Sequence, residues 1–152
     1  MSMSKMPAGA PGRSDLSIGA LARHTGVKVP TIRYYEQIGL MPPALRSDSN
    51  RRLYGPEDVQ RLAFIRHGRD LGFETDEIRQ LISLTGDPDH PCAEADAIAR
   101  RHLVDIDAKI ARLTAMRGEI ARMVDSCSHG AIATCRVIEV LADHDLCSHE
   151  RH

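Results

Sequence analysis

The sequence predicts a mainly α-helical fold, with short helices and a small β-hairpin in its first half and one long helix in its second. Aromatic residues make up only 3% of the chain and Trp is absent, so two Phe and three Tyr cannot fill the core of a β-sandwich. Apolar residues recur at helical spacing, and residues 93–125 contain no Pro and a single Gly. These features favour helices over a core built on sheets.

The composition is that of an ordinary soluble protein. Hydrophobic residues make up 42% of the 152 residues and charged residues 27%. No apolar run approaches the ~20 residues that span a bilayer. Residues 1–15 have no stretch typical of a secretory signal and are expected to form a disordered arm. We therefore expect a cytoplasmic protein whose four Cys are metal ligands or redox thiols rather than a disulfide framework.

The net charge of −1 conceals an asymmetry between the two halves of the chain. Residues 16–71 carry nine Lys or Arg against five Asp or Glu, a balance of +4. Residues 72–152 carry nine against fifteen, a balance of −6. A basic first half and an acidic second half suggest that only the first meets a polyanion, although this signal is weak by itself.

Two short helices are expected near the start of the chain. Ser17 is a suitable cap for a helix over 18–24, which Thr25 and Gly26 end. A second helix runs over 30–37, with Pro30 in its first turn. Two short helices joined by a Gly-containing turn are typical of a helix-turn-helix.

The segment that follows has the features of a wing. Residues 41–54 place residues that suit a β-strand on both sides of a Ser-Asp-Ser-Asn turn, as a two-stranded hairpin would. A third helix opens at 55–58 and breaks at 71–73, and a fourth begins near Thr75. We therefore expect a winged helix-turn-helix domain over 16–85.

A long helix over 93–125 is expected to be a dimerisation element. Its apolar residues alternate in steps of four and three, with one interruption at Arg117, which is the pattern of a coiled-coil seam. The seam consists of Ala99, Leu103, Ile106, Ile110, Leu113, Ile120 and Val124. The helix could instead pack on its own domain, but too little other chain is left to cover it. Pairing with an identical helix is favoured, and the heptads leave the parallel and antiparallel arrangements open.

The organisation beyond the first domain follows from this helix. A loop and the dimerisation helix occupy 86–126, and a Cys-bounded loop with a short helix over 137–142 occupies 127–143. The remaining residues, 144–152, form a tail that contains His and Cys and that we expect to be mobile.

Candidate DNA contacts lie on the second helix and in the wing. Arg binds guanine or phosphate in bidentate fashion, and Tyr and Thr donate to phosphate oxygens. The candidates of the helix are Thr31, Arg33, Tyr34 and Tyr35, and those of the wing are Arg46, Arg51 and Arg52. Because aromatic residues are scarce, we expect one of the two Tyr rings to face the core and the other to face the phosphates.

Three Cys are placed as a divided metal site. Cys92 stands at the start of the long helix, and Cys127 and Cys135 follow its end. At 1.5 Å per residue such a helix is about 50 Å long, so Cys92 cannot meet Cys127 within one chain. In an antiparallel dimer, Cys92 of one chain would lie beside Cys127 and Cys135 of the other. The alternative is that these Cys are small buried apolar residues.

Histidines extend the candidate ligand set. His129 offers a nitrogen ligand that suits Zn²⁺ or Cd²⁺, whereas sites of thiolates alone also suit Hg²⁺ and Pb²⁺. A second group in the tail is either an auxiliary site or a bystander, and the sequence does not decide between them. Its members are His144, Cys147, His149 and His152.

The chain resembles the MerR family of bacterial metal- and drug-responsive regulators over about residues 16–142. The resemblance is carried by Ile18-Gly-Ala-Leu-Ala, Thr25-Gly-Val, Thr31-Ile-Arg-Tyr-Tyr-Glu, Gly39-Leu, Arg52-Leu-Tyr, Phe64-Ile-Arg, Leu71-Gly-Phe and Glu77-Ile. It implies a winged-helix domain, an antiparallel coiled-coil homodimer and activation by distortion of promoter DNA that RNA polymerase also binds. It also adds Tyr54 to the candidate DNA contacts.

Two positions depart from the family pattern. The wing turn is usually Gly-Tyr-Arg and is Asn50-Arg51-Arg52 here; Asn tolerates the left-handed backbone conformation, so the turn can survive. Lys28 replaces the small hydroxyl residue that often precedes the recognition helix. It should weaken the helix cap and offer a phosphate contact instead.

The resemblance also indicates the class of metal. The branch of the family that senses monovalent copper or gold has Ser where Cys92 stands, so Cys92 resembles the divalent branches. Zinc, cadmium or lead is favoured as the effector, with mercury as a further candidate. A copper-responsive regulator and a thiol redox sensor using a Cys127–Cys135 disulfide are the alternatives. The family's iron–sulfur branch needs four closely spaced Cys in the loop, and this loop has two. A zinc enzyme is disfavoured, because no His-Glu-x-x-His or comparable motif occurs.

Overall fold

Ser17 begins the first helix as the sequence predicts. The computed structural model describes residues 15–148. The Ser17 hydroxyl accepts a hydrogen bond from the Ala20 N–H at 3.1 Å and caps α1 (Ile18–Thr25). The helix ends at Gly26, whose φ of 69° is in the left-handed region that favours glycine. Both predicted ends of this helix are confirmed.

The turn at Gly26 is further restricted by a side chain of the third helix. A Cβ atom at Gly26 would lie 2.1 Å from Nη1 of Arg66, which donates a hydrogen bond to the Thr25 carbonyl. A side chain at Gly26 would displace the Arg66 guanidinium and would be strained at a φ of 69°, so glycine suits the turn between α1 and α2 (Val29–Gln37) best. Lys28 stands at the cap position of α2 without a side-chain cap, so the predicted weakening of that cap is confirmed.

The wing is a short antiparallel hairpin. Strands β1 (Leu45–Arg46) and β2 (Arg52–Leu53) pair directly. Asn50 has a φ of 61° in the turn between them, which confirms the left-handed conformation expected there. Leu16 forms an additional antiparallel bridge with Tyr54, so the start of the domain extends the hairpin. That long-range pairing was not predicted.

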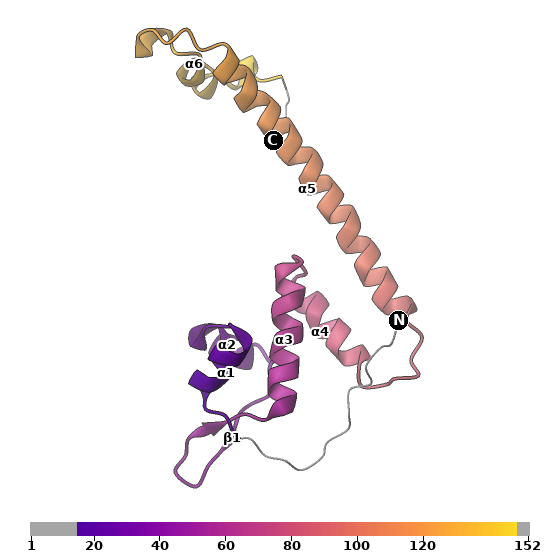
Figure 1. The fold of residues 1–152 in the computed structure, drawn as a ribbon. Coiled ribbons are helices and arrows are strands. Elements are labelled where there is room, and N and C mark those ends of the chain that lie inside the picture. Colours follow the sequence, from indigo (N-terminus) through magenta and orange to yellow (C-terminus); the bar gives the residue numbers. More distant parts are fainter. Residues whose placement is uncertain (1–14, 149–152) are drawn as a thin grey trace. The chain divides into compact units, whose positions relative to one another are not determined.

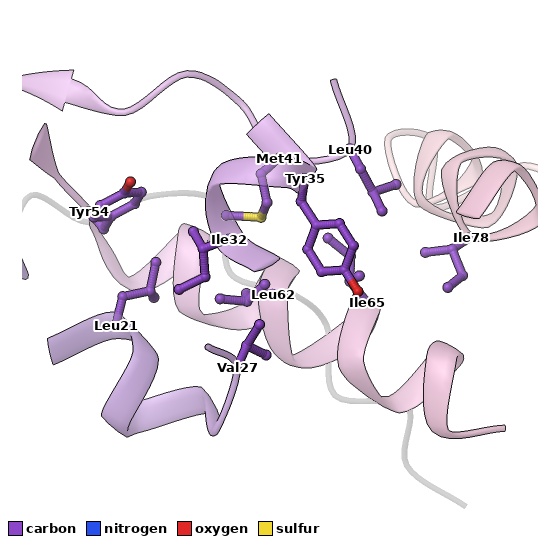
Figure 2. Packing of buried hydrophobic residues seen from close by; sticks show 10 residues of the cluster. All are labelled: Leu21, Val27, Ile32, Tyr35, Leu40, Met41, Tyr54, Leu62, Ile65 and Ile78. Atoms are coloured by element: carbon purple, nitrogen blue, oxygen red, sulfur yellow. The ribbon is translucent and has the colours of Figure 1, made fainter. Parts of the chain in front are cut away.

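Two further helices complete the first unit and its core. Helix α3 (Pro56–Asp70) leads through Gly72, with a φ of 86°, into α4 (Thr75–Leu84). Helix α1 packs against both α2 and α3 (Figure 1). The buried cluster, seen in Figure 2, contains Leu21, Val27, Ile32, Tyr35, Leu40, Met41, Tyr54, Leu62, Ile65 and Ile78. All four helices of this unit contribute to it, which makes the recognition helix part of one rigid core.

The chain divides into two compact units between His90 and Pro91. The second unit consists mainly of α5 (Ala93–Asp125), whose 33 residues match the predicted long helix (Figure 1). It is followed by η1 (Ile132–Thr134), α6 (Arg136–Ala142) and η2 (His144–Leu146). Helix α6 packs against α5, and η2 packs against α6.

A buried polar interaction ties the wing to α2. Tyr54 is 1% exposed, and its hydroxyl donates a 2.5 Å hydrogen bond to Oε1 of Glu36. Burial, with the hydrogen bond and negative charge of Glu36, raises the pKa of Tyr54 well above its ordinary value of about 10. Arg52 lies on the other oxygen of Glu36, with its Nη1 3.4 Å from Oε2. The carboxylate is thus held from two residues of the wing.

We expect Tyr54→Phe to lower the free energy of unfolding by ~1–3 kcal/mol, because a partly buried carboxylate oxygen loses its donor. The folded state holds the tyrosine proton more tightly than the unfolded chain. Stability should therefore fall as the pH rises past about 10, and Tyr54→Phe should lack this component.

Urea unfolding followed by circular dichroism, at neutral pH and at several values near pH 10, measures both effects. Tyr34→Phe is the control, because the Tyr34 side chain is 50% exposed and its loss should change stability by less than ~0.5 kcal/mol. Equal stability of Tyr54→Phe and the parent would contradict the role of this hydrogen bond.

Candidate DNA-binding surface and metal-binding region

The recognition helix α2 has one buried face and one exposed face. Ile32 and Tyr35, three residues apart, are buried in the core of the first unit. Arg33 and Tyr34 are exposed. Of the two Tyr rings, Tyr35 is therefore the one that faces the core, as expected of one of the pair, and its role as a DNA contact stays a prediction. Tyr34 keeps its hydroxyl available to a ligand.

Four of the predicted arginines lie around one concavity of about 540 Å³. Arg33 comes from α2, and Arg46, Arg51 and Arg52 come from the wing. Ser17 and Ile18, at the start of α1, complete its lining. The fold thus brings together arginines that are up to nineteen residues apart in sequence. Four guanidinium groups around an open hollow make a surface suited to phosphate groups.

Two of these arginines are also bound within the protein. Arg46 donates from Nη1 to the Asn50 carbonyl at 3.1 Å, and Arg52 pairs with Glu36. Tyr54 is buried in this structure, and its role as a DNA contact stays a prediction. Its place in the motif is explained by the hydrogen bond to Glu36, which holds the wing in position.

A second basic concavity, of about 330 Å³, lies at the start of α2. It is lined by the predicted residues Lys28, Thr31 and Tyr35 and by Arg66 and Arg69 of α3, which were not among the predicted contacts. Arg66 and Arg69 are three residues apart and therefore share a helix face. This spacing of two arginines within the basic first half of the chain is the sequence feature that could have indicated a second basic surface. Asp70 also lines this concavity and tempers its charge.

The three Cys of the divided site occupy opposite ends of α5. Cys92 is the N-cap residue of this helix and is exposed. Cys127 lies two residues beyond the last residue of the helix, Asp125, and is partly buried. A helix of 33 residues is about 50 Å long, so the two thiols of one chain are far apart.

The loop after α5 brings a nitrogen donor near a thiol. The Cys127 sulfur is 4.0 Å from Nδ1 of His129. His129 has a φ of 54°, a conformation that costs a residue with a side chain about 1–2 kcal/mol. Cys135 is the N-cap residue of α6, so its position is fixed by the start of that helix. Thiolate sulfur and imidazole nitrogen are donors that fit a soft or borderline metal ion.

One chain alone does not assemble a complete metal cage within the described residues. Among residues 15–148, no group of three or more His, Cys, Asp or Glu side chains is arranged to hold a metal ion.

The start of the tail is folded, which corrects the expectation that 144–152 are mobile throughout. His144 opens η2, and Cys147 follows it with its N–H donating to the His144 carbonyl at 3.0 Å. Cys147 is partly buried. His149 and His152, the other two candidates of the tail, lie outside the described residues.

The predicted seam of α5 is largely uncovered in one chain. Five of its residues are 55–62% exposed. They are Leu103, Ile110, Leu113, Ile120 and Val124. An apolar stripe of this length on an exposed helix face is typical of a surface that associates. Within the described residues, no helix has both the length and the apolar character needed to cross a membrane.

Comparisons with known proteins show which families and proteins this chain is similar to. Residues 16–85 match the family described as MerR HTH family regulatory protein, and residues 59–123 match the one described as MerR, DNA binding. The HTH-type transcriptional regulator ZntR of Escherichia coli K12 is 40% identical over 128 residues, which cover 82% of this chain and 90% of that protein. The Heavy metal-dependent transcription regulator 2 of Rhizobium meliloti is 37% identical, with 84% and 87% covered.

A solved structure gives the same result. The transcription regulator PbrR691 from Ralstonia metallidurans CH34, in complex with lead(II), has a TM-score of 0.71 and 35% identity to this chain. The match covers 83% of this chain and 98% of that one. The predicted mainly helical fold with its helix-turn-helix is confirmed, and the chain belongs to the MerR family of helix-turn-helix transcription regulators, with heavy-metal-dependent regulators among its relatives.

Proposed function

We propose that the protein is a homodimeric regulator that activates metal-resistance or efflux genes when a divalent soft or borderline metal ion binds at the dimer interface. The observation that carries this proposal is the arrangement of α5. This helix exposes an apolar seam along its length and has Cys92 at one end and Cys127 just beyond the other. The exposed seam supports association of two chains, and the separation of the Cys supports a metal site that a second chain completes.

An antiparallel pairing of two α5 helices joins these features. The N-terminal end of one helix then lies beside the C-terminal end of the other, so Cys92 of one chain meets Cys127 and Cys135 of its partner. A bound divalent ion would supply positive charge that draws the thiolates together. The length of α5 sets the distance between Cys92 and Cys127 of one chain, and the start of α6 sets the position of Cys135.

Zinc, cadmium and lead are the favoured effectors. Three thiolates with an imidazole nitrogen beside them suit these ions, and thiolates alone also suit mercury. His129 is placed to contribute that nitrogen, because its Nδ1 lies 4.0 Å from the Cys127 sulfur. The lead(II) complex of PbrR691, a relative at 35% identity, supports this class of effector.

The first unit supplies the contact with promoter DNA. The exposed face of α2 presents Arg33 and Tyr34 for base edges and phosphates, and the two basic concavities flank this helix. A dimer would place two such units on one duplex. Metal binding can change transcription only by favouring one dimer shape over another, and we propose that the favoured shape distorts the promoter for RNA polymerase.

We expect Arg33→Ala to weaken specific promoter binding by ~1–3 kcal/mol through loss of a base contact. Arg51→Ala should instead weaken binding evenly across sequences and reduce its salt dependence by about one phosphate contact. Fluorescence anisotropy with promoter and scrambled duplexes at several salt concentrations separates the two effects. Parent-like binding by both variants would exclude this surface.

We expect the protein to sediment at about twice 16.8 kDa and Ile110→Glu to dissociate it, because the dimer would bury an unpaired charge. Ala108→Glu is the matched control, since it adds the same side chain to an exposed position of α5 away from the seam. Sedimentation velocity and DNA binding are measured together. A monomeric Ile110→Glu that keeps full DNA affinity would argue against the dimer.

We expect Cys92→Ser to abolish induction by zinc, cadmium and lead while DNA binding stays nearly intact, because Cys92 is not one of the residues of the first unit. Weak monovalent sensitivity would be the expected gain, since only the two loop thiolates remain. A promoter reporter titrated with zinc, cadmium, lead, mercury and copper salts measures this. Cys147→Ser, which should have a smaller effect, is the control. Normal divalent induction in Cys92→Ser would show that Cys92 is not a ligand.

A further inference from the structure

A buried carboxylate on α5 binds the C-terminal segment. Glu119 is only 5% exposed, although most charged residues lie at the surface. One of its oxygens, Oε1, accepts a hydrogen bond from the backbone N–H of Ser148 at 2.8 Å, across 29 residues of sequence. The same carboxylate pairs with Arg122, one turn further along the helix. These two interactions offset the cost of burying the charge.

The chain between α6 and Ser148 is folded locally. The Asp143 side chain accepts a hydrogen bond from the Asp145 N–H at 3.0 Å and opens η2. The Cys147 N–H bonds to the His144 carbonyl. Residues 143–148 therefore leave α6 as a single turn whose far end is fastened to α5. We call these residues the strap.

The strap follows directly after α6, which packs against α5. Met123, four residues beyond Glu119 and on the same helix face, is 5% exposed, and Val140 of α6 is 4% exposed. Helix α6 packs against α5, and η2 packs against α6. Glu119 and Met123 are not among the exposed seam residues of α5, so the strap and the seam use different residues of this helix.

We propose that the bond between Glu119 and the Ser148 amide is a latch that holds the strap closed and limits access to the Cys147 thiol. Cys147 immediately precedes the latched amide and is partly buried. Thiol reagents and soft metal ions reach it freely only when the latch opens. Glu119 is thus a positioning residue for a thiol outside the three Cys of the divided site, and this inference does not depend on the proposed function.

The test is the alkylation rate of each Cys in the reduced, metal-free full-length protein, measured with N-ethylmaleimide and peptide mass spectrometry. Trypsin cleavage after Arg122, Arg136 and Arg151 places Cys147 on a different peptide from Cys127 and Cys135. The thiols of Cys127 and Cys135 thus serve as internal standards in the same digest.

Ser148→Pro removes the amide donor, whereas Ser148→Ala keeps it. The backbone of Cys147, with φ −79° and ψ 145°, already has the conformation that a following Pro requires. We expect Ser148→Pro to speed Cys147 alkylation by roughly tenfold, the change expected for loss of a charge-assisted hydrogen bond. Ser148→Ala should react like the parent, and the rates of Cys127 and Cys135 should not change.

Glu119→Ala tests the acceptor, with Glu139→Ala as a control that removes an exposed, Arg-paired carboxylate from α6. We expect the first to speed Cys147 alkylation and the second to leave it unchanged. Glu119→Gln should give a smaller increase than Glu119→Ala, because an amide oxygen still accepts a hydrogen bond. Cys147 rates that equal the parent's in both Glu119 variants and in Ser148→Pro would overturn the latch.

Discussion

The arrangement of the DNA-binding unit depends on the carboxylate of Glu36. This residue belongs to α2, and both of its oxygens are held by the wing, through the Tyr54 hydroxyl and the Arg52 guanidinium. Tyr54 in turn bridges Leu16, ahead of α1. Few buried apolar residues connect the recognition helix to the hairpin, so these polar contacts fix the position of one relative to the other. The arginines of the wing can then lie around the same hollow as Arg33.

The sequence predicted features that depend on neighbouring residues. Caps and breakers such as Ser17 and Gly26 act within a few residues, so the helix ends could be read directly. The limits of α5 followed from the absence of Pro and from its periodicity. The strand-like bridge of Leu16 and the burial of Tyr54 could not be read in this way. Both depend on partners many residues away in the sequence. From sequence alone, a tyrosine in a basic segment such as Tyr54 can equally well contact phosphate or pack in the core.

The candidate metal end shows a different limit of sequence reasoning. Positions alone predicted that the Cys of one chain are divided between the ends of α5, and the helix observed has that length. The local geometry of the loop was not predictable, because His129 adopts a left-handed backbone that nothing in its own residue type favours strongly. The fold of the strap was missed for a similar reason. It depends on Glu119, which sequence alone marks as one more charged residue on a solvated helix.

The division of α2 into two faces has a consequence for how such a protein changes over evolution. Ile32 and Tyr35 satisfy the core, while Arg33 and Tyr34 contribute little to it. Substitutions on the outward face therefore cost little folding free energy. Under the proposed DNA contact of these residues, operator preference can drift, or be redirected by a small library at the outward positions, while the core of the unit is left as it is. The fold in this sense separates the inheritance of stability from the inheritance of sequence preference.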